Sequence, residues 1–341
     1  MPLNVQIELG TVRLKDKQPS TETEGKPYLW TVFFKIDDAN RSGDPIATVV
    51  SFPGSHGSLG VDKVTAPAVI RVPQSIGRWE TGLTPIPLVG AFVGVVAVLM
   101  EEDNVSDDGA EAGRLELTKQ VRKAVDEIAA HLLLGPTFDI DALEETIESE
   151  VKEAIQDQQN IFENIWSLFG PDDIIGSMVW HAEYDDLANS STPLTFSAVW
   201  EIFREHKIVV LGGEVDLPDI LVSEWSLDGQ ARTFTESRPR FSTTALNFGS
   251  VQSGLVRSRG FTIWNFTSQD LSLVLTKTGS QAFSCTSAID VPQSTHAGVN
   301  VTFDPIQPGP SSGSVVVKSQ GSSATIATIS LTGSTPVGRA P

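Results

Sequence analysis

The stretch LNFGSVQSG, residues 246–254, decides the fold of the C-terminal part of this 341-residue chain. Apolar Leu246 and Phe248 alternate with polar residues and then meet a glycine, which is typical of a half-buried strand that ends in a turn. No helical period occurs after Arg240, and further short strand-like runs follow at turn-bounded spacing. These runs are residues 260–265, 271–276, 298–303, 313–318 and 324–331. The pattern predicts a β-sandwich of about a hundred residues.

Four sequence blocks in this region resemble the ASH (abnormal-spindle/hydin) type of immunoglobulin-like domain. They are LNFGSVQSG at 246–254, FTIWN at 261–265, VTFDP at 301–305 and ISLTG at 329–333. The resemblance covers residues 239–334 and implies an immunoglobulin-like β-sandwich, with Phe248 and Phe303 filling the space between its two sheets. Such domains are binding and scaffolding modules without catalytic residues, and they also occur in bacterial surface and assembly proteins. The resemblance therefore implies attachment rather than catalysis.

The first hundred residues also have strand character. Leu3, Val5, Ile7 and Leu9 alternate with polar residues, and β-rich runs follow at 28–36 and 47–52. After Met100 the apolar period becomes helical.

The helical segment predicts two helices. The apolar positions of the first recur in steps of three and four from Leu117 to Leu132, and Gly135-Pro136 stops it. The second begins at Asp141, where Glu144 completes a capping box, and ends before Gly170-Pro171. The two form an acidic helical hairpin inserted at about 104–170. Its apolar face is covered either by the sandwich or by a protein partner.

The chain therefore divides into four parts. Strands resume at 174–184 and 207–211, with a short helix expected at 196–203 between them, and the polar stretch 229–238 reads as a linker. We predict a β-sandwich at 1–228, the linker at 229–238, the immunoglobulin-like sandwich at 239–334 and a loose tail at 335–341.

The N-terminal part resembles C2 domains, the calcium- and phospholipid-binding β-sandwiches. VGVVAVLMEED at 93–103 and GPDDIIG at 170–176 are similar to the third-loop pattern of that family, although the helical hairpin separates them. The resemblance implies a C2-like β-sandwich with a helical insertion. It matches Glu101, Asp103 and Asp172 to the acidic positions of the family.

Two alignments of the first C2-like loop remain open. In one, Asp38 and Asp44 follow a strand and Asp44-Pro45 matches the Asp-Pro step of the family. In the other, Asp16 precedes Lys26-Pro27-Tyr28, and a ligand position is occupied by lysine. The candidate calcium site is thus Asp38, Asp44, Glu101, Asp103 and Asp172, because a hard cation takes six to eight oxygen ligands. The alternative is that these carboxylates are solvated loop charges.

Charge excludes one class of partner. The chain has 24 basic and 43 acidic residues and a formal net charge of −19, which repels phosphate backbones and argues against nucleic-acid binding. Residues 101–157 hold 17 acidic and five basic residues, whereas residues 235–341 hold four acidic and seven basic. The single cysteine, Cys285, excludes an internal disulfide and is expected to be an inert, buried thiol.

The uncharged stretch 81–100 is close to the length that crosses a bilayer. Its prolines, glycines and valines favour a buried strand, with membrane insertion as the alternative. The first residues lack the pattern of a secretory signal, so we expect synthesis in the cytosol, with a place in an exported or surface assembly left open.

No catalytic or cofactor motif occurs, since the five histidines lack metal-site spacing and no Walker, GxGxxG or GxSxG pattern is present. The leading hypothesis is a non-enzymatic structural protein, a scaffold component of a larger, bacterial assembly, with protein partners at the hairpin and at the immunoglobulin-like module. The alternatives are calcium-dependent docking to a phospholipid membrane surface and pore formation through residues 81–100. A hydrolase with an unrecognised site would have to gather a histidine and carboxylates in one pocket.

Overall fold

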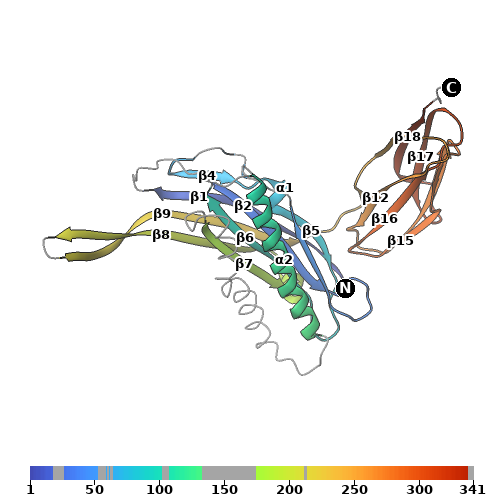
Figure 1. Cartoon of the computed structure of the whole chain (residues 1–341). Coiled ribbons are helices and arrows are strands. Elements are labelled where there is room, and N and C mark those ends of the chain that lie inside the picture. Colours follow the sequence, from blue (N-terminus) through green and yellow to red (C-terminus); the bar gives the residue numbers. More distant parts are fainter. Residues whose placement is uncertain are drawn as a thin grey trace. The chain divides into compact units, whose positions relative to one another are not determined.

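The computed structural model describes residues 1–17, 27–52, 59, 61, 64–101, 107–132, 174–210 and 213–336. Residues 3–233 form one compact unit, and residues 234–341 belong to a second (Figure 1). Both are built mainly of strands, as the sequence predicts.

Two sheets make up the N-terminal unit. The first sheet has the order β4 (Ala68–Arg71), β1 (Leu3–Lys17), β9 (Gly213–Thr233), β8 (Leu194–Val210), and β5 (Arg78–Leu83) pairs with β1 as well. The second sheet has the order β3 (Ile46–Ser51), β2 (Pro27–Asp37), β6 (Phe92–Glu101), β7 (Ile174–Glu183). All of these pairings are antiparallel. Two short helices, α1 (Gln74–Gly77) and α5 (Tyr184–Asn189), lie in the connections.

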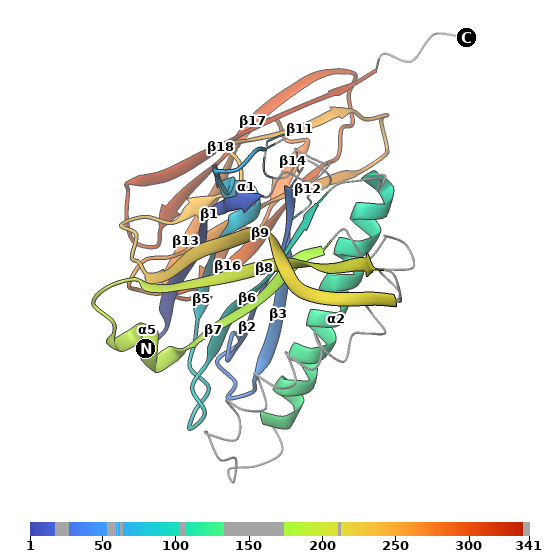
Figure 2. The same cartoon turned by 90° about the vertical axis from the view of Figure 1, so that its left-hand side faces the viewer.

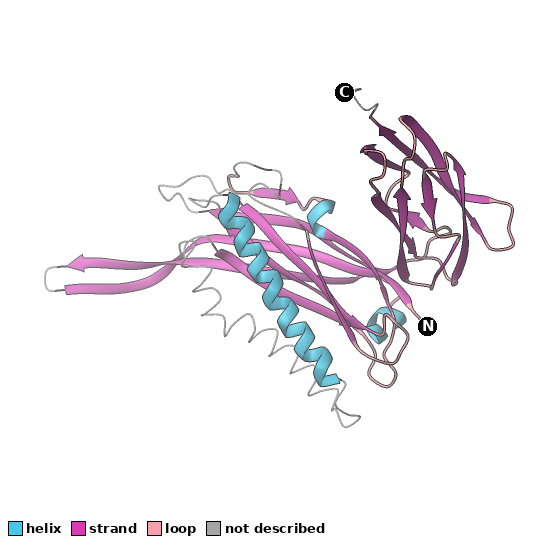
Figure 3. Cartoon of the chain, turned by 45° about the vertical axis from the view of Figure 1, so that its right-hand side comes forward, coloured by secondary structure: helices cyan, strands magenta, loops and turns pink. Residues whose placement is uncertain are grey.

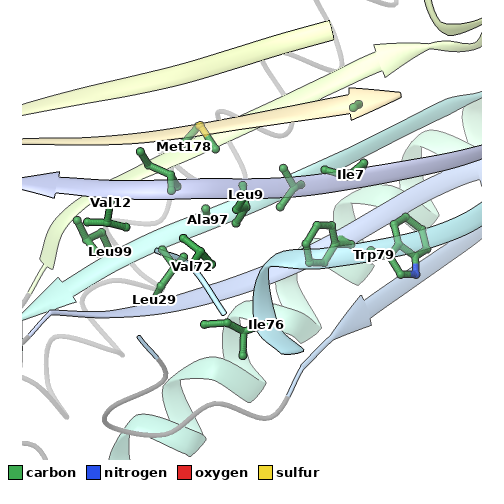
Figure 4. Close-up of a cluster of buried hydrophobic side chains, with 14 of the residues drawn as sticks. Ile7, Leu9, Val12, Leu29, Val72, Ile76, Trp79, Ala97, Leu99 and Met178 are labelled. Carbon is green, nitrogen blue, oxygen red and sulfur yellow. The ribbon is translucent and has the colours of Figure 1, made fainter. Parts of the chain in front are cut away.

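The main core of this unit lies between the two sheets (Figure 4). Ile7, Leu9 and Val12 of β1 face Leu29 of β2 and Leu99 of β6, and all five side chains are almost completely buried. The alternation that predicts a strand at residues 3–9 is thus the alternation between the core and the outer face of the sheet. The predicted β-sandwich is confirmed.

Helix α2 (Asp107–Leu132) packs on the outer face of the second sheet (Figures 2 and 3). Its apolar side chains, among them Leu117, Val121 and Ile128, are buried against strands β2 and β6. Arg114 Nη1 donates to Ser51 Oγ at 2.7 Å, which ties the helix to the edge strand β3. The apolar face of this helix is therefore covered by its own sheet, and the prediction that it serves as a protein-docking element is wrong. The second predicted helix, 141–170, lies outside the described residues.

Strand β1 contains a bulge opposite Asp228. Between the pairs Leu9–Gly229 and Val12–Leu227, two residues of β1, Gly10 and Thr11, face one residue of β9. The Asp228 carboxylate accepts from the backbone N–H of Thr11 at 2.9 Å and from its hydroxyl at 2.5 Å. A Cβ on Gly10 would overlap that carboxylate, so a larger residue here would displace Asp228 from the bulge.

We expect Asp228→Ala to destabilise the N-terminal unit by about 1–3 kcal/mol, because the bulged N–H of Thr11 loses its acceptor. Asp228→Asn keeps one carbonyl oxygen for that N–H and is the matched control. Urea unfolding measures both variants. Equal losses for the two would mean that the negative charge of Asp228, and not the accepted hydrogen bond, stabilises the bulge.

The C-terminal unit is an immunoglobulin-like sandwich of two sheets. One sheet has the order β10 (Arg240–Phe241), β12 (Arg257–Asn265), β16 (Thr295–Phe303), β14 (Phe283–Cys285). The other has the order β11 (Ala245–Ser250), β18 (Thr325–Thr335), β17 (Gly309–Ser319), β13 (Leu271–Gly279), β15 (Ala288–Val291). The rings of Phe248, Phe283 and Phe303 meet in its core. The predicted fold and the predicted place of Phe248 and Phe303 are confirmed.

The structure corrects two local predictions. Residues 196–203 are part of strand β8 and not a helix, since Phe196 and Trp200 pack on the core while Ser197 and Glu201 are exposed. The predicted linker 229–238 begins too early, because β9 continues to Thr233 and Ala231 is fully buried.

The uncharged stretch 81–100 contains a buried strand. Its last part is β6, which pairs with strands on both sides and whose Val95, Val96 and Ala97 are fully buried. Inserting this strand into a bilayer would require the sandwich to open. Within the described ranges, no helix has the length and hydropathy to span a membrane.

Candidate binding surface

Asp38, the first predicted calcium ligand, holds its own loop together. Its carboxylate oxygens accept from the backbone N–H groups of Ser42 at 2.7 Å and Gly43 at 2.9 Å. The residue is buried, whereas Asp44 further along the loop is exposed. The Asp38 side chain thus closes the turn between β2 and β3.

The structure does not bring the five predicted ligands together. Ile36 pairs with Phe92 at one end of strands β2 and β6, and Pro27 pairs with Glu101 at the other. Asp38 and Glu101 therefore lie at opposite ends of the second sheet, about 30 Å apart at 3.3 Å per residue. The alignment that combines Asp38 and Asp44 with Glu101 is wrong. Asp103 and Asp172 lie outside the described residues.

The alternative alignment is only partly within the described residues. Pro27 pairs with Glu101, and Met100 pairs with Ile174 at the start of β7. Lys26, like Asp103 and Asp172, lies outside the described residues. In this alignment a ligand position is lysine, and calcium binding stays a prediction. Among the described residues, no group of three metal-ligating side chains comes together.

A buried ion pair lies next to Asp38. Lys35 Nζ donates to Asp37 Oδ2 at 2.8 Å and to the carbonyl of Gly82 at 2.7 Å. The side chains are 9% and 1% exposed, and Asp37 Oδ2 also accepts from the N–H of Thr84. Burial raises the pKa of Asp37, and the ammonium of Lys35 opposes that rise. The pair joins β2 to the end of β5 inside the sandwich.

A cavity of about 600 Å³ lies beside the β1 bulge. It is lined by the carboxylates of Glu8 and Asp228 together with Arg71, Thr195 and Phe196, and its lining contains no histidine. The Asp228 carboxylate in this lining already holds the bulge.

Cys285 is half-buried in strand β14. Desolvation raises the pKa of its thiol, and the nearby charge of Lys277 opposes the rise. The thiol is therefore protonated at neutral pH, when it is a poor nucleophile.

Two loops at one end of the C-terminal unit expose large apolar side chains. Leu255 and Val256, between β11 and β12, are 57% and 60% exposed, and Ile306, between β16 and β17, is 81% exposed. Ser253 Oγ donates to the Ile306 carbonyl at 3.1 Å and joins the two loops. The first pair of the adjoining strands, Arg257–Phe303, keeps the loops together. We call Leu255, Val256 and Ile306 the tip patch.

Hydrogen bonds hold the backbone next to the tip patch in place. Arg257 Nη1 donates to the Phe248 carbonyl at 2.6 Å, and the Asp304 N–H donates to the Ala282 carbonyl at 2.8 Å. A pocket of about 440 Å³, lined in part by Pro305, Ile306 and Pro308, lies next to the patch. Residue 234, where this unit begins, is at the other end of the sandwich, where the Phe234 ring contacts that of Phe266. The tip patch therefore lies at the end remote from the connection to the N-terminal unit. The sequence shows these three residues only as apolar loop positions, which is a weak signal.

Comparison with known proteins gives structural likeness only. No family model and no curated protein matches the chain. The chain is similar to the ASH/PapD-like domain of human CEP192, with 14% identity over 30% of this chain and 89% of that one and a TM-score of 0.26. It is also similar to the CsuC–CsuE chaperone–tip subunit complex of Acinetobacter baumannii, at 8% identity over 29% of this chain and 53% of that one, TM-score 0.24.

A third solved structure is a family 123 glycoside hydrolase from Clostridium perfringens, at 10% identity over 27% of this chain and 23% of that one, TM-score 0.24. Because none of these three scores exceeds 0.26, the immunoglobulin-like fold rests on the strand pairing and the core described above. The likeness to an ASH domain is the one that the sequence predicts.

Proposed function

We propose that the protein is a non-enzymatic binding and structural protein, and that its C-terminal unit attaches it to a protein partner through the tip patch. The observation that carries the proposal is the exposure of three large apolar side chains on two loops joined by a hydrogen bond. Single exposed apolar residues are ordinary on protein surfaces, whereas a contiguous group commonly marks an interaction site.

The position of the patch supports an attachment role. It lies at the end of the unit remote from the residues that lead to the N-terminal unit. Its loops are held by backbone hydrogen bonds, so little conformational entropy is lost when a partner binds. An apolar centre beside charged Arg257 and Asp304 has the composition of an interface core with a polar rim. The partner surface is expected to be apolar at its centre. The protein would serve as a component of a larger assembly.

Substituting the tip patch tests the proposal. We expect Leu255→Asp combined with Ile306→Asp to weaken partner binding at least about tenfold, because a charge would be buried at the centre of the interface. Both substitutions change exposed side chains, so the thermal unfolding temperature of this double variant should stay unchanged. Binding is measured by quantitative affinity capture of proteins from extracts of the organism's own cells, followed by titration of each captured protein.

Val274→Asp is the matched control, since Val274 is an exposed valine of the same unit on strand β13, away from the loops. Partners that are lost with the tip variant and retained with the control support the proposal. Equal capture by the wild type, the tip variant and the control would refute it.

A further inference from the structure

Strands β8 and β9 continue beyond the rest of the first sheet. The pairing of β9 with β1 ends at Ser223, opposite Lys17. Beyond that point, β8 and β9 pair with each other as far as Val210 and Gly213. Figures 1 and 3 show this two-stranded ribbon extending away from the remainder of the N-terminal unit. We call residues 203–210 and 213–222 the arm.

Both edges of the arm are open in the part of the chain that the structure describes. Strand β8 is the last strand of the first sheet, and in the arm β9 pairs with β8 alone. A two-stranded ribbon is at best marginally stable in water, and its unpaired N–H and C=O groups are a template for a further strand. The arm is thus the part of this sandwich best suited to strand addition.

The distal part of the arm has two unlike faces. Paired residues of an antiparallel ribbon share a face, and neighbours along a strand alternate. The pair Ile208–Val215 and the positions of Val210 and Leu217 fall on one face. The pairs Lys207–Asp216 and Val209–Glu214 fall on the other. His206, opposite Leu217, shares the register positions of the first face, and the charged Lys207, Glu214 and Asp216 take positions on the other.

The two edges also differ in charge. The β8 half of the arm has Arg204, Glu205 and Lys207, a net charge of +1, whereas the β9 half has Glu214, Asp216 and Asp219, a net charge of −3. A register shift lies between Arg204 and His206, and Pro218 stands opposite this region on β9. Proline has no N–H to offer a further strand. Edge pairing is therefore confined to the distal segments, residues 206–210 and 213–217.

We propose that the arms of neighbouring copies of this chain pair edge to edge, with the β8 edge of one copy on the β9 edge of the next. In this arrangement each Lys207 lies between two acidic strands, its own β9 and that of the neighbour. Pairing of two β9 edges would instead place Glu214 and Asp216 against the same residues of the second copy, and like charges across strands destabilise. Contacts between unlike edges repeat from copy to copy, so the assembly is a ring or a filament and not a twofold dimer.

The proposal is tested by charge reversal in the full chain. The β8 variant is Lys207→Glu, and the β9 variant is Glu214→Lys with Asp216→Lys. Sedimentation velocity over a concentration series at low salt should show association of the wild type. Each variant alone has edges of the same sign, and its dissociation constant should rise about tenfold or more. An equimolar mixture of the two variants, and a chain that carries all three substitutions, should associate as the wild type does.

Several outcomes would overturn the proposal. They are a wild type that stays monomeric at high micromolar concentration, variants that associate unchanged, and a mixture that fails to restore association. Circular dichroism confirms that each variant is folded, and the triple substitution, which restores opposite charges within the arm, keeps the test valid if one variant unfolds. Leu255→Asp leaves arm pairing unchanged, so this proposal and the tip-patch proposal fail independently.

Discussion

Replacement of Lys35 by methionine will destabilise the N-terminal unit by about 3–5 kcal/mol at neutral pH, because it leaves the carboxylate of Asp37 buried without its cation. Asp37 is 1% exposed, and one of its oxygens, Oδ1, has no hydrogen-bond partner even in the intact pair. After the substitution the N–H of Thr84, at 3.1 Å, still donates to the Asp37 carboxylate. A single N–H does not replace an ammonium ion at 2.8 Å.

The loss will depend on pH in a defined direction. Burial raises the pKa of Asp37 above its ordinary value of 3.8, and Lys35 counteracts that rise. Without Lys35 the pKa of Asp37 rises further. A carboxyl whose pKa is raised by folding contributes stability that is complete below its unfolded pKa and is lost as the pH rises through its folded pKa. The Lys35→Met protein will therefore regain part of its stability when the pH is lowered from neutral to mildly acidic.

Urea unfolding followed by tryptophan fluorescence measures this effect, since six of the seven tryptophans precede residue 234. The control combines Lys35→Met with Asp37→Asn, which removes the unpaired charge and keeps an acceptor for the Thr84 N–H. We expect the double variant to recover most of the lost free energy of unfolding and to lose the pH dependence. A double variant that is no more stable than Lys35→Met would attribute the loss to packing of the lysine chain.

Short-range patterns predicted the class of fold well. Val5, Ile7 and Phe248 occur in alternating runs, and each of them is buried in a sandwich core. The three- and four-residue steps from Leu117 to Leu132 likewise gave the buried face of α2. These predictions hold because a strand or helix with one buried face has apolar residues at its own period, whatever element that face packs against.

Predictions that depended on distant partners failed. Gly229 reads as a loop residue, yet it lies inside β9, where a Cβ would overlap the ring of Phe196. A glycine within a strand commonly marks such a close approach. The same Phe196 ring stacks on Trp180 with a centroid separation of 4.3 Å. Phe196 is remote in sequence from Gly229, and Trp180 is remote from Phe196. Local patterns therefore did not reveal strand β8 or the length of β9.

The alignment of the first C2-like loop through Asp38 and Asp44 failed for a related reason. Asp44-Pro45 matches a family step locally, but the end of the sheet at which a residue lies is set by the register of β2 on β6. Register depends on the pairing of whole strands. The tip patch was missed because exposure, and not residue type, distinguishes Ile306 from the buried Ile329.

Phe303→Ala will destabilise the C-terminal unit by about 3–5 kcal/mol. The Phe303 ring is fully buried, stacks on Phe283 with a centroid separation of 4.8 Å and lies 5.6 Å from the Phe248 ring. A Cβ on Gly333 would press on its ring at 2.7 Å, so β18 approaches the ring closely. Removing the ring opens a cavity that the two remaining phenylalanines, themselves packed against each other, cannot fill. A domain of this size has a total stability of about 5–15 kcal/mol, so the loss is a large fraction of it.

Hydrogen exchange followed by mass spectrometry separates the two units, because it reports the opening free energy of β16 and β17 without a signal from residues 3–233. We expect faster exchange throughout strands β11 to β18 and unchanged exchange in β1 and β6. Ile306→Ala is the control three residues away, and its side chain is 81% exposed, so its effect should stay within about 0.5 kcal/mol. If exchange in β1 and β6 also rises after Phe303→Ala, the two units unfold together. The stability of the whole chain would then have to be measured for the tip-patch variants, because unfolding of the C-terminal sandwich would also unfold the arm.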